Sequence, residues 1–391
     1  MKNRKILDLY SDYLISSFKL ATSTGLSELL DGALSHDQIS RFLGQRTFNQ
    51  MDYWKCVKPI VRRFEHANGL IKIDDTIEEK PHTTENEIVC WHWDHSKKPE
   101  AGLVKGINII NFQYQSPLLF DSPSMPKDKL GKGENISIPV AFEIVKKTES
   151  WFDKKSGKVK RRSPVTKNTM VQERLRILHH MNKLQFKYVL WDTWFSSKEN
   201  FDFIHYELQK YFVAAIKSNR NVALNCPEDN LNRKYYRVDE LDFQKASTIT
   251  VWLKGMDFPV QLCRQVFKNK DGTTGELYLV TNDLQLSFQD ITTTYEERWG
   301  VEMLHKSLKQ NVGLEKSPTK NEVTQSNHVF AAMIAWMKLE LLRLKEGSNH
   351  FALKAKLYTK ALEAAFLELQ RLKKCQPRLE YVSQDIIPLL R

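Results

Sequence analysis

The chain has 391 residues, of which 41% are hydrophobic and 27% are charged. Such a composition excludes a disordered, collagen-like or disulfide-stabilised protein, and the length is enough for two or three domains. The formal net charge of +12 makes the chain a candidate for binding a polyanion. A basic globular protein without such a partner fits the charge equally well.

Neither the cysteines nor the apolar runs indicate an extracellular or membrane protein. The five cysteines are widely spaced and form no CxxC pair, which argues against a disulfide framework or a zinc ribbon. The longest apolar run, 329–337, is far shorter than the roughly 20 residues that a bilayer span needs. Asp8 and Asp12 interrupt the apolar stretch at the start, so it does not resemble a signal peptide. We therefore expect a cytoplasmic protein with no membrane partner.

Residues 1–68 are predicted to be helical. The apolar spacing predicts helices over 5–20 and 49–67, and Ser35 with Gln38 fits a capping box that starts a third helix ending near Gly44. Five basic side chains on these segments favour a DNA-binding bundle of helix-turn-helix type: Arg41, Arg46, Lys55, Arg62 and Arg63. A bundle that serves only for packing is the alternative.

Strand-like and helical segments then alternate in an order typical of an RNase H-like α/β core. Three apolar or β-branched runs come first, and two helix–strand pairs follow: 69–75, 87–94, 103–114, then helix 170–184, strand 188–192, helix 200–211 and strand 212–217. Residues 117–133 hold a Pro- and Gly-containing loop. Residues 146–167 are strongly basic and are predicted to form an exposed loop, either a phosphate-contacting arm or a solvated loop without function.

A β-rich insertion and a helical end complete the predicted organisation. Strand-like pieces occur at 235–238, 247–253, 260–267 and 277–281, with a hairpin turn at 269–275. Helix resumes at about Thr293, and 327–345 and 349–374 are predicted packing helices. The expected regions are a DNA-binding helical region 1–68, a mixed-sheet core 69–219, the insertion 220–288, a core helix region 289–325 and a helical region 326–391.

Three carboxylates stand where they could meet. Asp74 and Asp75 end one apolar strand, Asp192 ends another, and Glu302 lies on a later helix. Taken singly, such residues are usually turn, cap or solvated groups. Together they would provide hard oxygen ligands for Mg²⁺ or Mn²⁺, and two such ions about 3.5–4 Å apart can activate water or a 3′-hydroxyl against a phosphodiester.

The helix that carries Glu302 has a second pattern. Tyr295, Arg298, Glu302 and Lys309 fall within an arc of roughly 60° at about 100° per residue, so one helix face would present all four. Arg298 and Lys309 could then pair with phosphate oxygens while Glu302 holds metal. A salt-bridged surface face is the alternative.

These residues resemble a known family. Tyr295-x2-Arg298-x3-Glu302-x6-Lys309 is similar to the YREK signature of bacterial insertion-sequence DDE transposases in all residue types and spacings. The family's first motif, Asp-x-Thr after apolar residues, resembles 73–76, and its second resembles 189–192. The family also carries a β-rich insertion before the Glu. The resemblance covers about residues 65–325.

The resemblance implies roles for these residues. Asp74, Asp192 and Glu302 would bind Mg²⁺, which Mn²⁺ can replace, and Tyr295, Arg298 and Lys309 would contact the DNA backbone. Aligning Thr76 with the family's Thr selects Asp74 over Asp75 as the first ligand. The residues after Asp192, Thr193-Trp194-Phe195, depart from the Arg-Gly-Phe-like sequence that is frequent there.

The implied function is that of a DDE transposase. Such an enzyme cuts DNA at the terminal inverted repeats of its insertion sequence, joins the 3′ ends to target DNA, and works as a homodimer near the nucleoid. Two alternatives stay open: a metal-dependent nuclease of the same fold without strand transfer, and a non-catalytic DNA-binding derivative. A metal site at Cys90, His92 and Asp94 is less favoured than packing, and Trp252 and Trp299 are expected to pack or to stack on a flipped base.

Overall fold

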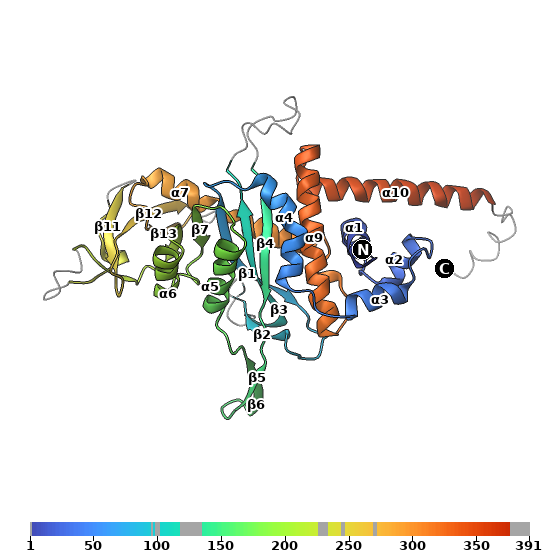
Figure 1. Ribbon diagram of the computed structural model, residues 1–391, viewed down its shortest axis with the longest axis horizontal. Helices are drawn as coiled ribbons and strands as arrows, with labels where there is room; N and C mark the ends of the chain where they lie inside the picture. Colours follow the sequence, from blue (N-terminus) through green and yellow to red (C-terminus); the bar gives the residue numbers. More distant parts are fainter. Residues whose placement is uncertain are drawn as a thin grey trace, which may run out of the picture.

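A large mixed β-sheet runs through the molecule and helices pack on it (Figure 1). The computed structural model describes residues 2–94, 97, 102–117, 135–225, 234–243, 247–268 and 272–375. In these ranges the sheet has eleven strands, in the order β10-β9-β11-β12-β13-β8-β7-β1-β3-β2, with β4 also paired to β3. The architecture is α/β and consistent with the expected RNase H-like core.

The strands of the large sheet alternate with short connections and helices. Their bounds are β1 Leu70–Glu79, β2 Val89–Trp93, β3 Leu103–Gln115, β4 Ser137–Ile144, β7 Tyr188–Trp191, β8 Tyr211–Ile216, β9 Asn221–Ala223, β10 Tyr236–Arg237, β11 Thr248–Leu253, β12 Val260–Lys268 and β13 Thr274–Thr281. A separate two-stranded sheet consists of β5 Glu149–Asp153 and β6 Lys158–Arg162.

The helices lie mainly at the two ends of the chain and between β6 and β8. Their bounds are α1 Lys2–Ser16, α2 Ser23–Leu29, α3 His36–Gly44, α4 Gln50–Phe64, α5 Lys167–Arg176, α6 Lys198–Asp202, α7 Phe288–Glu296, α8 Trp299–Gln310, α9 Glu322–Glu346 and α10 His350–Cys375. One π-helical turn follows α5 at Ile177–Met181 and another follows α6 at Phe203–Glu207. Among the described residues, no helix is long and apolar enough to cross a membrane.

The predicted order of strands and helices in the core is confirmed, with one addition. β1 pairs with β7 and β7 with β8 in parallel, while β3 runs antiparallel to β1. The addition is β4, which follows the Pro- and Gly-containing loop and pairs with the same edge of β3 as β2 does. Residues 118–133 of that loop, residues 269–271 of the predicted hairpin turn and residues 376–391 of the predicted helical end lie outside the described residues.

The strands of the predicted insertion continue the main sheet. β13 pairs antiparallel with β8, β12 pairs with β13, and β11 pairs with β12. The backbone groups on the free edge of β8 are therefore satisfied by β13, because a buried strand edge must find hydrogen-bond partners.

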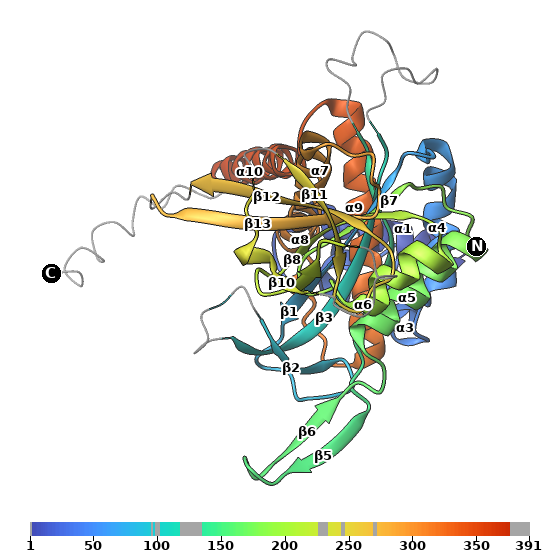
Figure 2. The same cartoon turned by 90° about the vertical axis from the view of Figure 1, so that its left-hand side faces the viewer.

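The prediction of a loop over residues 146–167 is wrong, because most of this basic segment folds as the β5–β6 hairpin. Asp153 ends β5, and its carboxylate accepts hydrogen bonds from the Lys155 amide (3.1 Å) and the Ser156 hydroxyl (2.7 Å). Gly157 follows with a φ of +65°, a conformation that glycine adopts without strain. These local contacts turn the chain back on itself, and the hairpin projects away from the body of the molecule (Figures 1 and 2).

Three of the N-terminal helices, α1, α3 and α4, correspond to the predicted ones, and α2 is additional. The capping box at Ser35 is present at the start of α3, and Asn49 caps α4 in the same way. α4 packs on β4, where the Tyr53 hydroxyl donates to the Pro139 carbonyl (2.6 Å).

The N-terminal helices are joined to α9, a helix of the C-terminal region. Most of the α9 side chains from Gln325 to Glu340 are buried, which is expected of a helix surrounded by other elements. Asn327 on α9 accepts a hydrogen bond from the Phe48 amide (2.8 Å) and donates to the carbonyls of Leu43 and Arg46 (both 2.7 Å). One buried side chain thus satisfies three backbone groups of the connection between α3 and α4.

Asn327→Ala is expected to lower the free energy of unfolding by about 3 kcal/mol, because it leaves buried backbone groups without partners. Urea unfolding followed by circular dichroism measures the change. Lys345→Ala, at an exposed position of the same helix, is the control and should change it by less than about 0.5 kcal/mol. Equal stability of the two variants would contradict the role given to Asn327.

Candidate metal and DNA site

Two of the predicted carboxylates come from neighbouring parallel strands. Asp74 lies on β1 and Asp192 directly follows β7. The β1–β7 pairing aligns Leu70 with Tyr188 and Lys72 with Leu190. Carried two residues further, the same offset brings Asp192 level with Asp74. Adjacent strands are about 4.8 Å apart, so the sheet places the two aspartates side by side.

A buried polar chain fixes the beginning of α8 against β1 and β3. The Lys72 ammonium, which is fully buried, donates to the Gln115 side chain, and Gln115 donates to the Glu297 carboxylate (2.6 Å). Gly300 in the first turn of α8 lies so close that a Cβ atom there would clash with the Lys72 Nζ. A larger residue at this position would therefore force the Lys72 ammonium to move from its place beside Gln115.

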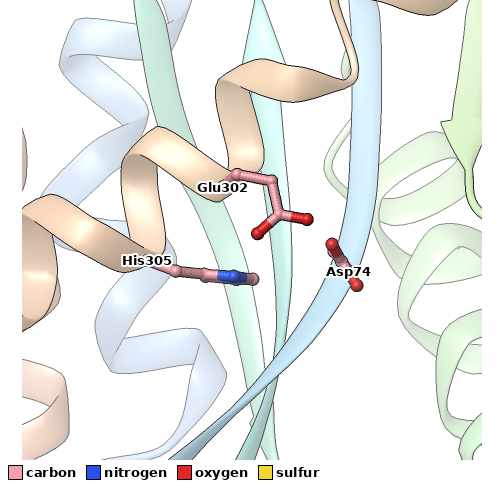
Figure 3. Close-up of side chains that lie close together, drawn as sticks. All are labelled: Asp74, Glu302 and His305. Atoms are coloured by element: carbon pink, nitrogen blue, oxygen red, sulfur yellow. The ribbon is translucent and has the colours of Figure 1, made fainter. Parts of the chain in front are cut away.

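α8 brings Glu302 and His305 to Asp74. One potential ligand atom from each of the three side chains lies within 4.8 Å of the others. Figure 3 shows the Glu302 carboxylate facing Asp74, with the His305 ring one turn further along the same helix. The structure thus brings together residues more than two hundred positions apart in the chain.

Arg298 supplies the positive charge beside these carboxylates. Its Nη1 lies 3.3 Å from the Asp74 Oδ2 and 3.6 Å from the Glu302 Oε1. Its side chain is 14% exposed, and its buried Nε has no hydrogen-bond partner among the described residues. The guanidinium therefore neutralises part of the charge of two carboxylates that would otherwise repel each other.

The positive charge of Arg298 does not fully offset the burial and the negative charges around Asp74. Burial, followed by the charges of Asp192 and Glu302, raises the pKa of Asp74 to about 8, although Arg298 opposes this shift. Burial also raises the pKa of Asp192, against a lowering by hydrogen bonding from the Trp194 amide (2.9 Å). Carboxylates that are held this close, with a deficit of positive charge, are the donor set that suits a divalent cation.

The comparison with known proteins agrees with this arrangement. Residues 162–338 match the family model described as "Transposase DDE domain". This part of the chain is therefore similar to a transposase DDE domain. The matched range includes Asp192 and Glu302, whereas Asp74 precedes it.

A protein of Sinorhizobium fredii (strain NBRC 101917 / NGR234) named "Putative transposase y4zB" is 30% identical over 139 residues. The aligned segment covers 34% of this chain and spans 37% of that relative's length.

Upstream of the matched range, the structure separates the two neighbouring aspartates of β1. Asp74 faces Arg298 and Glu302. Asp75 points to the opposite face of β1, where its Oδ2 accepts hydrogen bonds from Asn108 (2.5 Å) and Lys167 (2.8 Å). Because the Asp75 carboxylate is already paired with Lys167, the geometry favours Asp74 as the carboxylate that joins Asp192 and Glu302.

The single helix predicted to carry Tyr295, Arg298, Glu302 and Lys309 is instead two helices. α7 ends at Glu296 and α8 begins at Trp299. Between them the Arg298 amide bonds to the Tyr295 carbonyl and the Gly300 amide to the Glu297 carbonyl, three residues back instead of four. These tighter turns change the rotation per residue, so a constant 100° does not apply across the junction.

Two residues of the YREK pattern contact other protein groups. Tyr295 is 9% exposed and packs in an apolar group with Ile291 and Leu190, and burial raises its pKa to about 12. The Arg298 guanidinium lies over its ring, 5.6 Å from the centroid. The Lys309 ammonium donates to the Ile77 carbonyl (3.0 Å) and pairs with Glu315 (3.3 Å). Arg298 and Glu302 therefore lie directly at Asp74, and Tyr295 lies beside Arg298.

The sequence reasoning missed His305 and its partner. His305 is buried, its Nε2 lies 3.0 Å from the Asn111 Nδ2, and Asn111 stands opposite Asp74 in the β1–β3 register. The signal available was the spacing, because a residue three positions after Glu302 lies on the same side of a helix. Burial lowers the pKa of His305 to about 3, so the imidazole is neutral at pH 7.

The less favoured candidates are the residues of β2, Cys90 and His92, with Asp94, and the tryptophan Trp299. Across the described ranges, no cluster of three metal-ligating side chains includes Cys90, His92 or Asp94. Cys90 and His92 are buried in β2, in agreement with the packing interpretation. Trp299 is 63% exposed, so packing does not account for it.

The raised pKa of Asp74 gives a pH prediction for the metal-free protein. Between about pH 4 and pH 8 the folded state holds a proton on Asp74 that the unfolded state has lost. The free energy of unfolding should therefore fall as the pH rises through this window, by up to about 1.4 kcal/mol per pH unit from this group.

Urea unfolding in EDTA between about pH 5.5 and 7.5, for the wild type and Asp74→Asn, measures this contribution, because all other titrating groups are common to both proteins. The wild type should lose stability relative to the variant as the pH rises. Parallel pH dependences would contradict the shift.

Proposed function

We propose that the chain is a metal-dependent DNA transposase of the YREK group. It would cut DNA at the terminal inverted repeats of its insertion sequence and join the freed 3′ ends to target DNA, working as a homodimer in the cytoplasm beside the nucleoid. One observation carries the proposal: Asp74 and Glu302 converge, with Asp192 level with Asp74, in a chain that is similar over residues 162–338 to a transposase DDE domain.

The donor set fits divalent cations. Carboxylate oxygens from Asp74, Asp192 and Glu302 are hard ligands of the kind that Mg²⁺ prefers, and His305 adds an imidazole nitrogen that Mn²⁺ tolerates better. When bound, such ions would lower the pKa of the attacking water or 3′-hydroxyl and stabilise the leaving oxygen. The raised pKa of Asp74 supports this proposal, because it reflects the charge that a cation would neutralise.

The protein residues have positioning and charge-balancing roles in the proposed reaction. Lys72, Gln115 and Glu297 hold the start of α8, and the Trp194 amide orients Asp192. In the first step, water attacks phosphorus and the P–O3′ bond breaks, leaving a 3′-hydroxyl. In the second, that hydroxyl attacks a target phosphate and the target's 3′ oxygen leaves. One phosphodiester replaces another, so no nucleotide cofactor is needed.

The proposed DNA contacts differ in their support. Arg298 borders the acidic group and has a buried Nε without a partner among the described residues, which supports a role at the scissile phosphate. For Tyr295 and Lys309 the proposed backbone contacts depend on the resemblance to the YREK signature, because both side chains contact protein groups here.

Asp192→Asn and Glu302→Gln are expected to reduce Mg²⁺-dependent nicking of element-end DNA by about a thousandfold or more, because each removes a charged ligand. Binding of the same DNA in EDTA should stay within about threefold of the wild type. Glu363→Gln, an exposed carboxylate on α10, is the matched control and should nick normally. Full nicking by either of the first two variants would contradict the proposed ligand set.

A pre-cut element end with a free 3′-hydroxyl, incubated with plasmid DNA and Mg²⁺, distinguishes the alternatives. A transposase produces joined molecules that migrate as larger species on a denaturing gel. Cleavage of uncut ends without any joined product would instead indicate a nuclease of the same fold. DNA binding with neither product would indicate a non-catalytic derivative and would overturn the proposal.

A further inference from the structure

The β5–β6 hairpin is a surface feature that the acidic group does not explain. It forms its own two-stranded sheet, separate from the eleven-stranded one, and projects from the body of the molecule (Figures 1 and 2). An isolated two-stranded hairpin is only marginally stable in water. Its projection into solvent therefore needs a reason other than packing of the core.

The hairpin exposes large apolar side chains on both faces. Phe152 and Val159 are directly opposite each other in the register and are 62% and 65% exposed. Trp151 is 44% exposed on the other face, opposite Lys160. A small projecting ribbon that presents such side chains to solvent is typical of a binding surface.

The hairpin is also strongly basic. Residues 149–162 contain six basic and two acidic side chains. Both acidic groups already have basic partners within the hairpin, since Asp153 pairs with Lys160 and Glu149 with Arg162 (2.8 Å). Lys154, Lys155 and Lys158, near the turn, are exposed and form no ion pair with any described residue. Their charge is available to an anionic partner.

The root of the hairpin is held to β2, and the segment just beyond β6 is held to β1. Arg161 donates to the Lys147 carbonyl (3.5 Å), and the Lys147 ammonium donates to the Trp91 carbonyl of β2 (2.6 Å). Just beyond β6, Lys167 binds Asp75, the neighbour of Asp74 (2.8 Å). A polyanion held at the acidic group and extending past this root would meet the hairpin.

The dimensions fit a duplex. Five-residue strands make a ribbon roughly 16 Å long, and its two strands are about 4.8 Å apart. The major groove of B-form DNA is about 12 Å wide and admits a two-stranded β-ribbon. Basic groups near the turn can reach the flanking phosphates while apolar side chains face the sugars and base edges.

We infer that the β5–β6 hairpin is a DNA-binding arm that lies along a groove of the duplex next to the scissile phosphate. Lys154, Lys155 and Lys158 hold the phosphate backbone, and Phe152 and Val159 contact the groove. The inference depends on the proposed function, because it takes duplex DNA as the partner.

The first test compares two triple variants with the same loss of charge. Lys154→Ala/Lys155→Ala/Lys158→Ala removes the hairpin cations, and Lys356→Ala/Lys360→Ala/Lys373→Ala removes three exposed cations of α10, which lies far from the hairpin (Figure 1). The probe is a fluorescent duplex of about 30 base pairs, and anisotropy in EDTA gives the affinity between about 50 and 200 mM salt.

The hairpin variant should bind about tenfold more weakly at the lowest salt, with the slope of log K against log[salt] smaller by about 2 to 3. The α10 variant should keep a slope within about one unit of the wild type. Equal effects of the two variants, or a wild-type slope in the hairpin variant, would overturn the inference.

The second test concerns the apolar face. Phe152→Ser/Val159→Thr should weaken binding by about fivefold without changing the salt slope, because it removes apolar contact and no charge. Unchanged affinity, with an unchanged thermal midpoint to show that the protein is folded, would remove Phe152 and Val159 from the interface.

These measurements need no cleavage, so they separate the two proposals. If the hairpin variants nick DNA normally and bind it like the wild type, the hairpin is not a DNA-binding arm. The proposed function would be unaffected by that result. A wild-type protein that binds no duplex would overturn both the arm and the proposed function.

Discussion

The burial of Asp74 beside two other carboxylates is the constraint on which this site depends. Asp74, Asp192 and Glu302 come from two strands and a helix, and burial, followed by the charges of Asp192 and Glu302, raises the free-energy cost of ionising Asp74. The parallel pairing of β1 with β7 and the buried Lys72–Gln115–Glu297 chain hold them in place despite this cost. Arg298 offsets part of the charge. The proposed divalent cation would supply the positive charge that these side chains leave short.

The same constraint explains why polar groups reach so far into the molecule. A fully buried lysine is costly unless it is hydrogen-bonded, and burial lowers the pKa of Lys72 to about 8. Its ammonium nevertheless fixes the junction of α7 and α8, and Gly300 leaves the room that it needs. The position of Glu302 thus depends on residues outside the proposed ligand set, Lys72 and Gly300 among them.

Local patterns in the sequence were enough to predict much of the fold. The capping box at Ser35, the apolar strand that ends just before Asp192, and the two C-terminal helices follow from spacing alone. The prediction that the first strand ends at Asp74 and Asp75 is wrong, because β1 continues to Glu79 and pairs with β3 along its whole length. The break between α7 and α8 could not be predicted, because it arises from tight turns at Arg298 and Gly300 that suit contacts with a distant strand. The approach of His305 and Asn111 to Asp74 also depends on strand register, which no single segment encodes.

The arrangement of α9 has a consequence for how the molecule can be divided. This helix is buried along most of its length and packs against both the N-terminal helices and α8. A fragment that starts at residue 69 would uncover apolar side chains such as Phe330, which contacts Phe48 and Tyr53, and would leave Asn327 without its backbone partners. The N-terminal helices are thus part of the same cooperative folding unit as the acidic site, and a truncated catalytic fragment would be prone to aggregation.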